Sequence, residues 1–379
     1  MTGTKITKGS ASRAKLPAAH GYYMPAEWEP HESTWLAWPH LRGDWPGKFE
    51  PIPWVYAEIV RNLARHERVD LIVNTETAER RARAVLEQAN ALSGNVCFHR
   101  WRTDRVWVRD SGCIFLTPPA DLADAGLLAL HFQFNGWAKY PNYELDEKIG
   151  GRMAKAADAR VLRPVSGDHR VVVEGGSIDV NGCGTLITTE ECLLSTIQQR
   201  NPSMDRAAYE QMFADYFGVQ SVIWLDSGIA GDDTHGHVDD ITRFVAPNTV
   251  VTMIEQNERS ENYAALRANL GRLKNARSFS GNSEGQKLDI VEIPMPRPVK
   301  FEGRQLPASY ANFYIANGVV LVPVFNDPND RIALNALAEL FSTREIVPIY
   351  SGDLIWGFGA LHCMTQQQPL VIGPSLESV

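Results

Sequence analysis

The chain has 379 residues, of which 44% are hydrophobic and 22% charged, so it is long enough for one large or two ordinary globular domains. Its formal net charge of −8 gives no reason to expect a nucleic-acid partner and slightly favours a small cationic substrate. No apolar run approaches the roughly 18 residues of a membrane span, so no membrane partner is expected. Five cysteines, an odd number without a CxxC pair, predict free thiols in a reducing cytoplasm.

The first 20 residues differ in composition from the rest of the chain. They lack acidic groups and a hydrophobic segment, so they are not a secretory signal. We expect a disordered tail over 1–20, with a transit peptide as the alternative. No Gly/Ser-rich or Pro-rich linker interrupts the remainder, which predicts a single catalytic domain over 21–379.

Helical and strand-like stretches alternate from the start of that domain. Residues 57–66 and 75–92 carry apolar side chains at helical spacing with charges between them. The apolar run 69–73 between the two reads as a buried strand. This order predicts an α/β fold.

A strand–turn–strand unit recurs along the chain. It is complete at 171–189, 237–253 and 310–325, and similar units open at 109–116 and at 361. A polar residue stands before or within the first strand of each unit, at intervals of 64, 65, 73 and 51 residues: Asp110, Glu174, Asp239, Asn312 and Cys363. The repetition predicts supersecondary units around an axis, on which these side chains converge.

Cys363 lies in the segment GFGALHCMTQQQP (357–369), after a glycine-rich stretch and before three glutamines. A lone cysteine between Leu, His and Met is commonly a small buried hydrophobe. The glycines Gly357 and Gly359 instead allow a ligand to approach the backbone closely, which fits a nucleophilic thiol. We interpret the other four cysteines as structural.

His237 and Asp239 offer a base and a carboxylate. If the segment is a strand, residues i and i+2 share a face, so both side chains point into one space. That arrangement suits an acid/base group beside a carboxylate that holds a cation. A zinc site is the competing interpretation of His-x-His-x-Asp-Asp, but no set of downstream histidine ligands follows. Asp232, Asp233 and Asp240 are interpreted as turn, capping or supporting groups.

Two further carboxylates complete the inventory. Asp110 lies in WVRDSG (107–112), where an ion pair with Arg109 or a turn cap is the alternative role. Glu174 precedes two glycines, where the alternative is a β-bulge. Two carboxylates facing one pocket repel each other unless a cation lies between them, and a guanidinium pairs with both. Its central carbon is then open to a thiolate, so the residues indicate cysteine-dependent attack on an amidine or guanidine.

At these residues the chain resembles the agmatine deiminase/bacterial-type peptidylarginine deiminase family of guanidine-modifying enzymes. The matching segments are MPAEWEPHESTWLAWP (24–39), WVRDSG (107–112), FNGWAKY (134–140), EGGSIDVNG (174–182), GDDTHGHVDD (231–240), SYANFY (309–314) and HCMTQQQP (362–369). The resemblance implies the five-bladed α/β propeller called the pentein fold.

The resemblance also implies the roles of the site residues. Cys363 would be the nucleophile and His237 the general acid/base, with Glu174 orienting or charging His237. Asp110 and Asp239 would clamp the guanidinium. No cofactor or metal would be needed.

The substrate is less constrained by the resemblance than the chemistry is. Trp38, Trp107, Trp137 and Asn135 are candidate pocket walls, although each tryptophan is as well explained by core packing. The family's usual glycine-rich run before His-Cys is replaced here by residues 357–361, and Arg105 is an unexpected cation beside the substrate motif.

We expect hydrolysis of agmatine to N-carbamoylputrescine and ammonia, as in polyamine biosynthesis through putrescine. Free arginine, peptidyl-arginine or another alkylguanidine is the nearest alternative, and an amidinotransferase or a non-catalytic binding protein of the same fold comes next. The expected partner is a small cationic guanidine, with a homodimer as a possible assembly.

Overall fold

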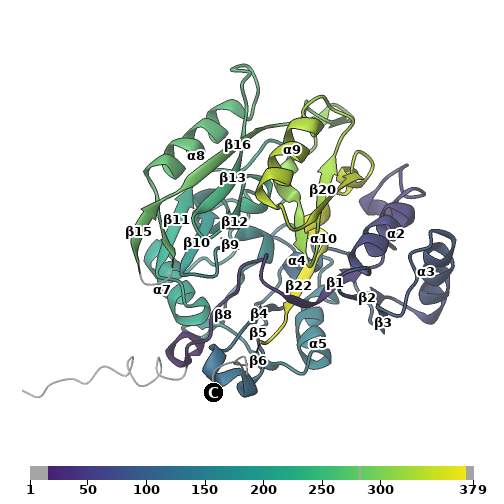
Figure 1. Ribbon diagram of the computed structural model, residues 1–379, viewed down its shortest axis with the longest axis horizontal. Coiled ribbons are helices and arrows are strands. Elements are labelled where there is room, and N and C mark those ends of the chain that lie inside the picture. The colour runs from purple at the N-terminus through teal and green to yellow at the C-terminus, as the bar shows by residue number, and fades with distance from the viewer. Residues whose placement is uncertain (1–15, 281–282, 373–379) are drawn as a thin grey trace, which may run out of the picture.

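The computed structural model describes residues 16–280 and 283–372 (Figure 1). Residues 1–15 of the expected tail lie outside this part. The prediction of disorder to residue 20 is wrong at its end, because Pro17–His20 form the 3-10 helix η1, which packs against the helix α7 (Arg206–Phe217). Pro17 is buried and Gly21 ends the turn at φ 76°.

Five sheets of three or four strands share one plan. In each, a first strand pairs antiparallel with a second, and the chain then passes through a helix into a third strand parallel to the second. The strands are, sheet by sheet, β22 (Gln366–Pro369), β1 (His31–Ala37), β2 (Arg68–Val73) and β3 (Val96–Arg100); β4 (Ile114–Leu116), β5 (Leu128–Leu130) and β6 (Arg160–Leu162); β9 (Asp179–Val180), β10 (Thr185–Thr189) and β11 (Ser221–Leu225); β12 (Thr242–Ala246), β13 (Thr249–Ile254) and β16 (Asp289–Pro294); β19 (Tyr314–Ala316), β20 (Val319–Val324) and β21 (Glu345–Tyr350).

The first sheet joins the two ends of the described chain. Its strand β22 comes from near the C-terminus and pairs with β1 near the N-terminus, as the yellow and purple ribbons in Figure 1 show. The helices that connect second and third strands are α2 (Ile52–Leu63), α5 (Ile149–Ala156), α7, α8 (Tyr263–Asn275) and α9 (Asp330–Leu340). A further helix, α3 (Glu76–Gln88), joins β2 to β3. The predictions of helices at 57–66 and 75–92 and of a strand at 69–73 are confirmed, with α2 starting five residues earlier.

Smaller elements fill the loops. They are η2 (Arg42–Asp44), η3 (Ala120–Ala125), η4 (Asp146–Lys148), α6 (Glu190–Leu194) and η8 (Leu354–Gly357), with the short hairpins β7 (Val165–Ser166)/β8 (His169–Arg170), β14 (Arg277–Ser280)/β15 (Ser283–Lys287) and β17 (Lys300–Phe301)/β18 (Arg304–Gln305). Among the helices that the structure describes, none combines the length and apolar character that a bilayer crossing needs.

Each sheet is entered through a short helical turn rather than through an extended strand. The turns are α4 (Val108–Ser111), η5 (Gly175–Ser177), η6 (Val238–Asp240), η7 (Tyr310–Asn312) and α10 (Leu361–Met364). They contact one another in that order, and α10 contacts α4, so the contacts close a ring. This ring brings together residues that lie far apart in the sequence.

Two strand predictions are therefore wrong in detail. The segment 171–176 is not a strand, because Gly175 packs directly on the Arg109 backbone, where an added Cβ would lie 2.3 Å from the Arg109 carbonyl oxygen. His237 and Asp239 lie not in a strand but at the start of η6 and within it. Their side chains still meet in one place, through the turn rather than through strand alternation.

Candidate active site

The five polar residues of the repeated units all lie at the ring of turns. Asp110, Asp239, Asn312 and Cys363 belong to α4, η6, η7 and α10, and Glu174 immediately precedes η5. All five are buried. The predicted convergence of these side chains is confirmed by the contacts described below.

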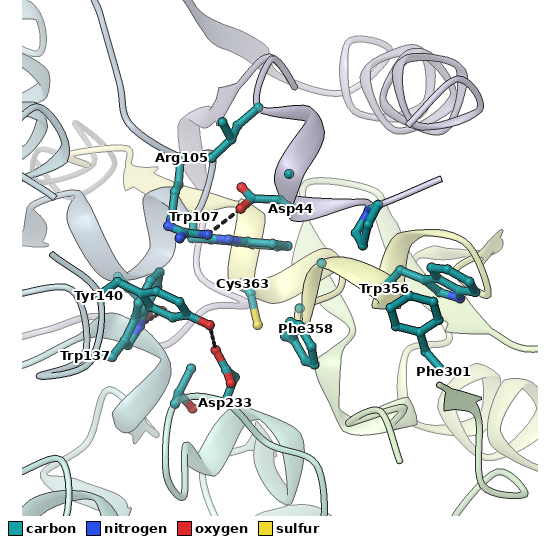
Figure 2. A pocket seen from close by; sticks show the side chains of 17 residues that line it. Asp44, Arg105, Trp107, Trp137, Tyr140, Asp233, Phe301, Trp356, Phe358 and Cys363 are labelled. Carbon is teal, nitrogen blue, oxygen red and sulfur yellow. Dashed lines mark hydrogen bonds and ion pairs between the residues drawn. The ribbon is translucent and has the colours of Figure 1, made fainter. Parts of the chain in front are cut away.

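Cys363 opens into a cavity of about 270 Å³ that Asp110 also lines (Figure 2). Figure 2 shows the sulfur directed into the space between Phe358 and the pair formed by Tyr140 and Asp233. The wall contains Gly357 and Gly359, where an added Cβ would strike the rings of Trp45 and Trp107 at 2.8 and 2.6 Å. Glycine is required here by the packing of the wall, which leaves the thiol accessible.

The Asp110 carboxylate is held by two donors. Trp137 Nε1 donates to Oδ2 at 2.9 Å, and the backbone N–H of Gly176 donates to Oδ1 at 3.0 Å. Burial, reinforced by the neighbouring Asp239 and Glu174, raises the pKa of Asp110 to about 6 against the opposing effect of His237. The alternative role of Asp110, an ion pair with Arg109, is not found among its described contacts, and Arg109 instead donates to Glu27 and Gln367.

His237 lies between two carboxylates. Its Nδ1 is 3.9 Å from Asp110 Oδ2, and its Nε2 is 3.8 Å from Glu174 Oε2. Burial disfavours the charged imidazole, but Asp110 and Glu174 outweigh it and hold the pKa of His237 well above its usual value. The protonated imidazole therefore predominates at neutral pH.

Glu174 is in turn fixed by a buried arginine. Arg200 Nε donates to Glu174 Oε1 at 3.0 Å, and both side chains are fully buried. Burial raises the pKa of Glu174, but Arg200 and His237 outweigh burial and lower the pKa to about 2. Glu174 is thus an anion that holds positive charge on His237.

Asp239 contacts both the thiol and a second histidine. Its Oδ2 lies 3.6 Å from Cys363 Sγ and 2.7 Å from His362 Nδ1. Nε2 of His362 is 2.8 Å from Oε2 of the buried Glu27. Burial raises the pKa of Asp239, but His362 and His237 outweigh burial and keep it below its usual value. Asp239 therefore stays ionised beside the thiol.

Asn312 holds the sulfur of Cys363 by a hydrogen bond. Its Nδ2 donates to Cys363 Sγ at 3.1 Å and to Asp240 Oδ1 at 3.0 Å, while its Oδ1 accepts from the backbone N–H of His362 at 2.9 Å. Burial and the nearby Asp239 raise the pKa of Asp240 well above the usual value of a carboxyl group. Asp240 supports Asn312 and does not line the cavity, which matches its predicted supporting role.

The surroundings of Cys363 favour the protonated thiol. Burial raises the pKa of Cys363 well above its usual value, and Asp239, Asp240 and Asp110 raise it further. A cation placed between Asp110 and Asp239 would reverse this effect of charge. The site is built to hold positive charge next to sulfur.

Gly176 marks the point where the reactive groups meet. A Cβ added to it would lie 2.6 Å from His237 Nδ1, 3.0 Å from Asp110 Oδ1 and 3.1 Å from Asp239 Oδ2. No side chain fits at this position. The glycine pair after Glu174 is thus explained by close approach of three functional groups rather than by a β-bulge.

One group of side chains in the described residues could hold a metal ion. The donor atoms of Glu174, Cys192 and His237 lie within 4.8 Å of one another, and all three residues are buried. Arg200 already pairs with Glu174 and places a positive charge beside the group, which disfavours a second cation there. Cys192, whose sequence context predicts a structural role, therefore lies beside the imidazole of His237.

The predicted pocket walls divide into two pairs. Trp107 and Trp137 line the cavity. Trp38 and Asn135 are not among the lining residues. Trp38 packs edge-on against Tyr56 in the core, and the side-chain Oδ1 of Asn135 accepts a hydrogen bond from the Ala138 N–H. The missed residues Glu27, His362 and Arg200 carry a weak signal: His362 is adjacent to Cys363, and Glu27 belongs to the conspicuous segment 24–39.

Comparison with known proteins agrees with this geometry. The profile of the family described as Porphyromonas-type peptidyl-arginine deiminase matches residues 23–369. The agmatine deiminase of Pseudomonas aeruginosa (strain LESB58) is 34% identical over 377 residues, covering 93% of this chain and 97% of the relative. That of Stutzerimonas stutzeri (strain A1501) is 33% identical over 376 residues with the same coverage.

Solved structures give the same result. The agmatine deiminase of Enterococcus faecalis superimposes with a TM-score of 0.84 at 28% identity, covering 93% of this chain and 97% of that one. The agmatine deiminase of C. jejuni superimposes with a TM-score of 0.77 at 28% identity, covering 92% and 96%. The chain therefore shares a mixed α/β architecture with these enzymes over nearly its whole length.

Proposed function

Because the chain belongs to the Porphyromonas-type peptidyl-arginine deiminase family, we propose that it is a cysteine-dependent guanidine deiminase that hydrolyses agmatine to N-carbamoylputrescine and ammonia. This makes it a hydrolase of the C–N bonds of linear amidines. The observation that carries the proposal is the convergence of the Cys363 thiol with the Asp110 and Asp239 carboxylates at one cavity. The relatives named above support agmatine as the substrate.

Binding and activation of the nucleophile are coupled. The guanidinium enters between Asp110 and Asp239, which pair with its N–H groups. The positive charge of the guanidinium stabilises the thiolate, so Cys363 releases its proton to solvent as the substrate binds. The thiolate, held by Asn312, then attacks the guanidinium carbon and forms a neutral tetrahedral adduct with a new C–S bond.

His237 donates a proton in the next step and accepts one in the step after it. As the protonated imidazole it gives a proton to the departing nitrogen, the C–N bond breaks, and ammonia leaves a positively charged S-alkylthiouronium on Cys363. The neutral imidazole then takes a proton from water, whose oxygen adds to the same carbon. Collapse of this adduct releases the thiolate and the ureido product. Glu174 is a positioning residue that keeps His237 charged for the first step.

The fold and its setting are proposed on the same basis. The five sheets and the closed ring of turns support a five-bladed propeller of the pentein type formed by one catalytic domain over 21–379. The odd number of cysteines supports a cytoplasmic location. A homodimer is a further expectation, and sedimentation of the purified protein tests it.

The experiment is a ureido-product and ammonia assay over agmatine, arginine, arginyl peptides and alkylguanidines. We expect agmatine to be turned over without any acceptor amine, which separates hydrolysis from amidino transfer. Cys363→Ala is expected to abolish turnover, whereas the exposed Cys97→Ala is expected to leave it unchanged. Full activity of Cys363→Ala, or no turnover of any guanidine, would overturn the proposal.

A further inference from the structure

We call the part of the cavity around Asp44, Arg105 and Asp233 its mouth. The Asp233 carboxylate there is already paired with other side chains of the chain. Lys139 Nζ and Arg304 Nη2 donate to its Oδ1, the latter at 3.0 Å. The Tyr140 hydroxyl donates to its Oδ2 (Figure 2). Burial raises the pKa of Asp233, but the hydrogen bonds from Lys139 and Tyr140 outweigh burial and lower it. Both oxygens are engaged, so Asp233 offers little to a substrate ammonium.

The second carboxylate, Asp44, pairs with Arg105. Arg105 Nη1 donates to its Oδ1, whereas its Oδ2 is buried and has no hydrogen-bond partner among the described residues. The Arg105 guanidinium also lies 4.3 Å from the centre of the Tyr140 ring. Burial raises the pKa of Asp44 to about 6, although Arg105 opposes the shift. One oxygen of Asp44 is therefore occupied by Arg105.

Cations outnumber carboxylates in the group of charged residues around Asp44 and Asp233. Arg105, Lys139 and Arg304 pair with these two carboxylates. The lining of the cavity itself contains Arg105 and three carboxylates, Asp44, Asp110 and Asp233, so Lys139 and Arg304 stand behind the wall. The cation in excess within the group attracts an anion to this side of the cavity.

Arg304 is the cation best placed to bind a ligand. It lies on the hairpin β17/β18, its side chain is 50% exposed, and its guanidinium carbon is 4.5 Å from the centre of the Phe358 ring that lines the cavity. Among the described residues it donates only from Nη2, to Asp233. Nε and Nη1 are left to pair with a carboxylate.

Phe358, whose ring contacts the Arg304 guanidinium, has a strained backbone conformation. Its φ of 65° and ψ of 19° are left-handed, which is rare for a bulky residue and costs on the order of 1 kcal/mol or more. The ring lies beside Cys363 in the cavity, whereas the Phe301 and Trp356 rings, whose centres are 4.0 Å apart, line another part of it (Figure 2). Strain of this kind is typical of ligand-binding positions.

We propose that the mouth is a subsite for a distal carboxylate, with Arg304 as its principal partner, so that the enzyme also deiminates ω-guanidino acids to ω-ureido acids. This inference rests on the proposed deiminase chemistry and adds a second class of substrate to it. The reacting bonds are unchanged: the oxygen of water replaces one guanidine nitrogen, which leaves as ammonia, and the carboxylate takes no part.

Three guanidines of similar chain length test the subsite. They are 4-guanidinobutyrate with a distal carboxylate, agmatine with a distal ammonium, and n-butylguanidine with neither. We expect 4-guanidinobutyrate to be turned over with a kcat/KM above that of n-butylguanidine, and its KM to rise with salt because the pairing is partly exposed.

Two arginine variants carry the same loss of charge. Arg304→Gln is expected to raise the KM for 4-guanidinobutyrate at least about tenfold relative to that for n-butylguanidine, as for the loss of a hydrogen bond between charged groups. Arg297→Gln is the control, because Arg297 is 73% exposed and its partner Asp327 does not line the cavity, whereas Asp233, the partner of Arg304, does. It is expected to leave all three KM values unchanged.

The outcomes separate the two proposals. Turnover of agmatine with none of 4-guanidinobutyrate, or an Arg304→Gln effect equal for all three compounds, would overturn the carboxylate subsite and leave the deiminase standing. Absence of turnover for every guanidine would instead overturn the proposed chemistry itself.

Discussion

Two buried polar clusters share the centre of the molecule and meet where His362 contacts Asp239. The structural cluster consists of Glu27, Arg109, Asp179, Arg243 and His362. The reactive cluster consists of Cys363, Asp110, Glu174, His237 and Asp239. Both are shielded from solvent, but they treat charge in opposite ways.

The structural cluster pairs its charges around Glu27, and of its atoms only Arg243 Nη2, which lies in an ion pair, is among the described buried atoms without a hydrogen bond. One carboxylate oxygen lies 2.9 Å from Arg243 Nη2 and accepts the Ile315 N–H at 2.8 Å, and the other accepts from Arg109 at 3.2 Å. Burial raises the pKa of Glu27, but Arg243 and His362 outweigh burial and bring it well below the usual value. Such a network fixes geometry.

The reactive cluster leaves polar atoms without hydrogen-bond partners. These atoms are Glu174 Oε2, Asp239 Oδ1 and both ring nitrogens of His237. Three carboxylates are close to one imidazole, so negative charge is in excess until a cation arrives. Both clusters contain buried charges, so burial alone does not distinguish them. Buried polar atoms without hydrogen-bond partners do, and they mark the cluster at which we propose that the substrate binds.

The largest expected effect comes from Asp110→Asn. Loss of one arm of the guanidinium clamp should lower kcat/KM about 10³-fold, as for a buried charge pair deprived of one partner. The pKa of Asp110 is raised on folding from 3.8 to about 6, so its ionisation costs stability as the pH rises through that range. At pH 7 the neutral Asn should therefore increase the free energy of unfolding, by up to roughly 3 kcal/mol.

Steady-state kinetics and urea unfolding measure the two quantities on one preparation. A variant that is both inactive and less stable than the parent would contradict the assignment of Asp110 to the reactive cluster.

Glu27→Gln should act in the opposite direction. Removing the anion leaves Arg109 and Arg243 buried with less countercharge, which costs about 3 kcal/mol of unfolding free energy. Urea unfolding at pH 7 measures the loss. Equal stability of Glu27→Gln and the parent would contradict the stabilising role that distinguishes the structural cluster from the reactive one.

Asn312→Ala tests the link between the nucleophile and its support. The hydrogen bond to sulfur strengthens when the thiolate forms, so its loss should lower kcat about 30-fold, equivalent to about 2 kcal/mol, with little change in KM. The rate of alkylation of Cys363 by iodoacetamide against pH is the second readout. It should shift to higher pH in the variant, whereas a purely structural role for Asn312 would leave it in place.

The sequence predicts the reactive cluster better than the structural one, for a physical reason. The repeated turn-and-strand unit places one polar residue at each entry to a sheet, so Asp110, Glu174 and Cys363 can be found by their spacing. Glu27 belongs to no such repeat, because its partner Arg243 lies more than 200 residues away and is brought to it only by the fold. Cys192 was missed because helix α6 carries it to the imidazole after β10.

Local geometry was the less predictable part. Alternation in a strand was expected to align His237 with Asp239, but a 3-10 turn aligns them instead. The error arises because a short polar run between apolar strands is compatible with either conformation. The two side chains nevertheless lie close together as predicted, because both conformations bring them to the same end of the sheet.

The smallest effect is a pH window that separates the clusters. The pH dependence of kcat/KM reflects the protonation of the free enzyme. We therefore expect kcat/KM to be maximal above the Asp110 pKa of about 6 and to fall about tenfold for each pH unit below it. Glu27 has a lowered pKa, so the stability that it contributes is present above its unfolded value near 4.5 and is lost only as the pH falls through its folded value. At pH 5 the enzyme should therefore be about tenfold less active yet fully folded, as activity and circular dichroism at the same pH would report. Simultaneous loss of both would mean that the two clusters titrate as one.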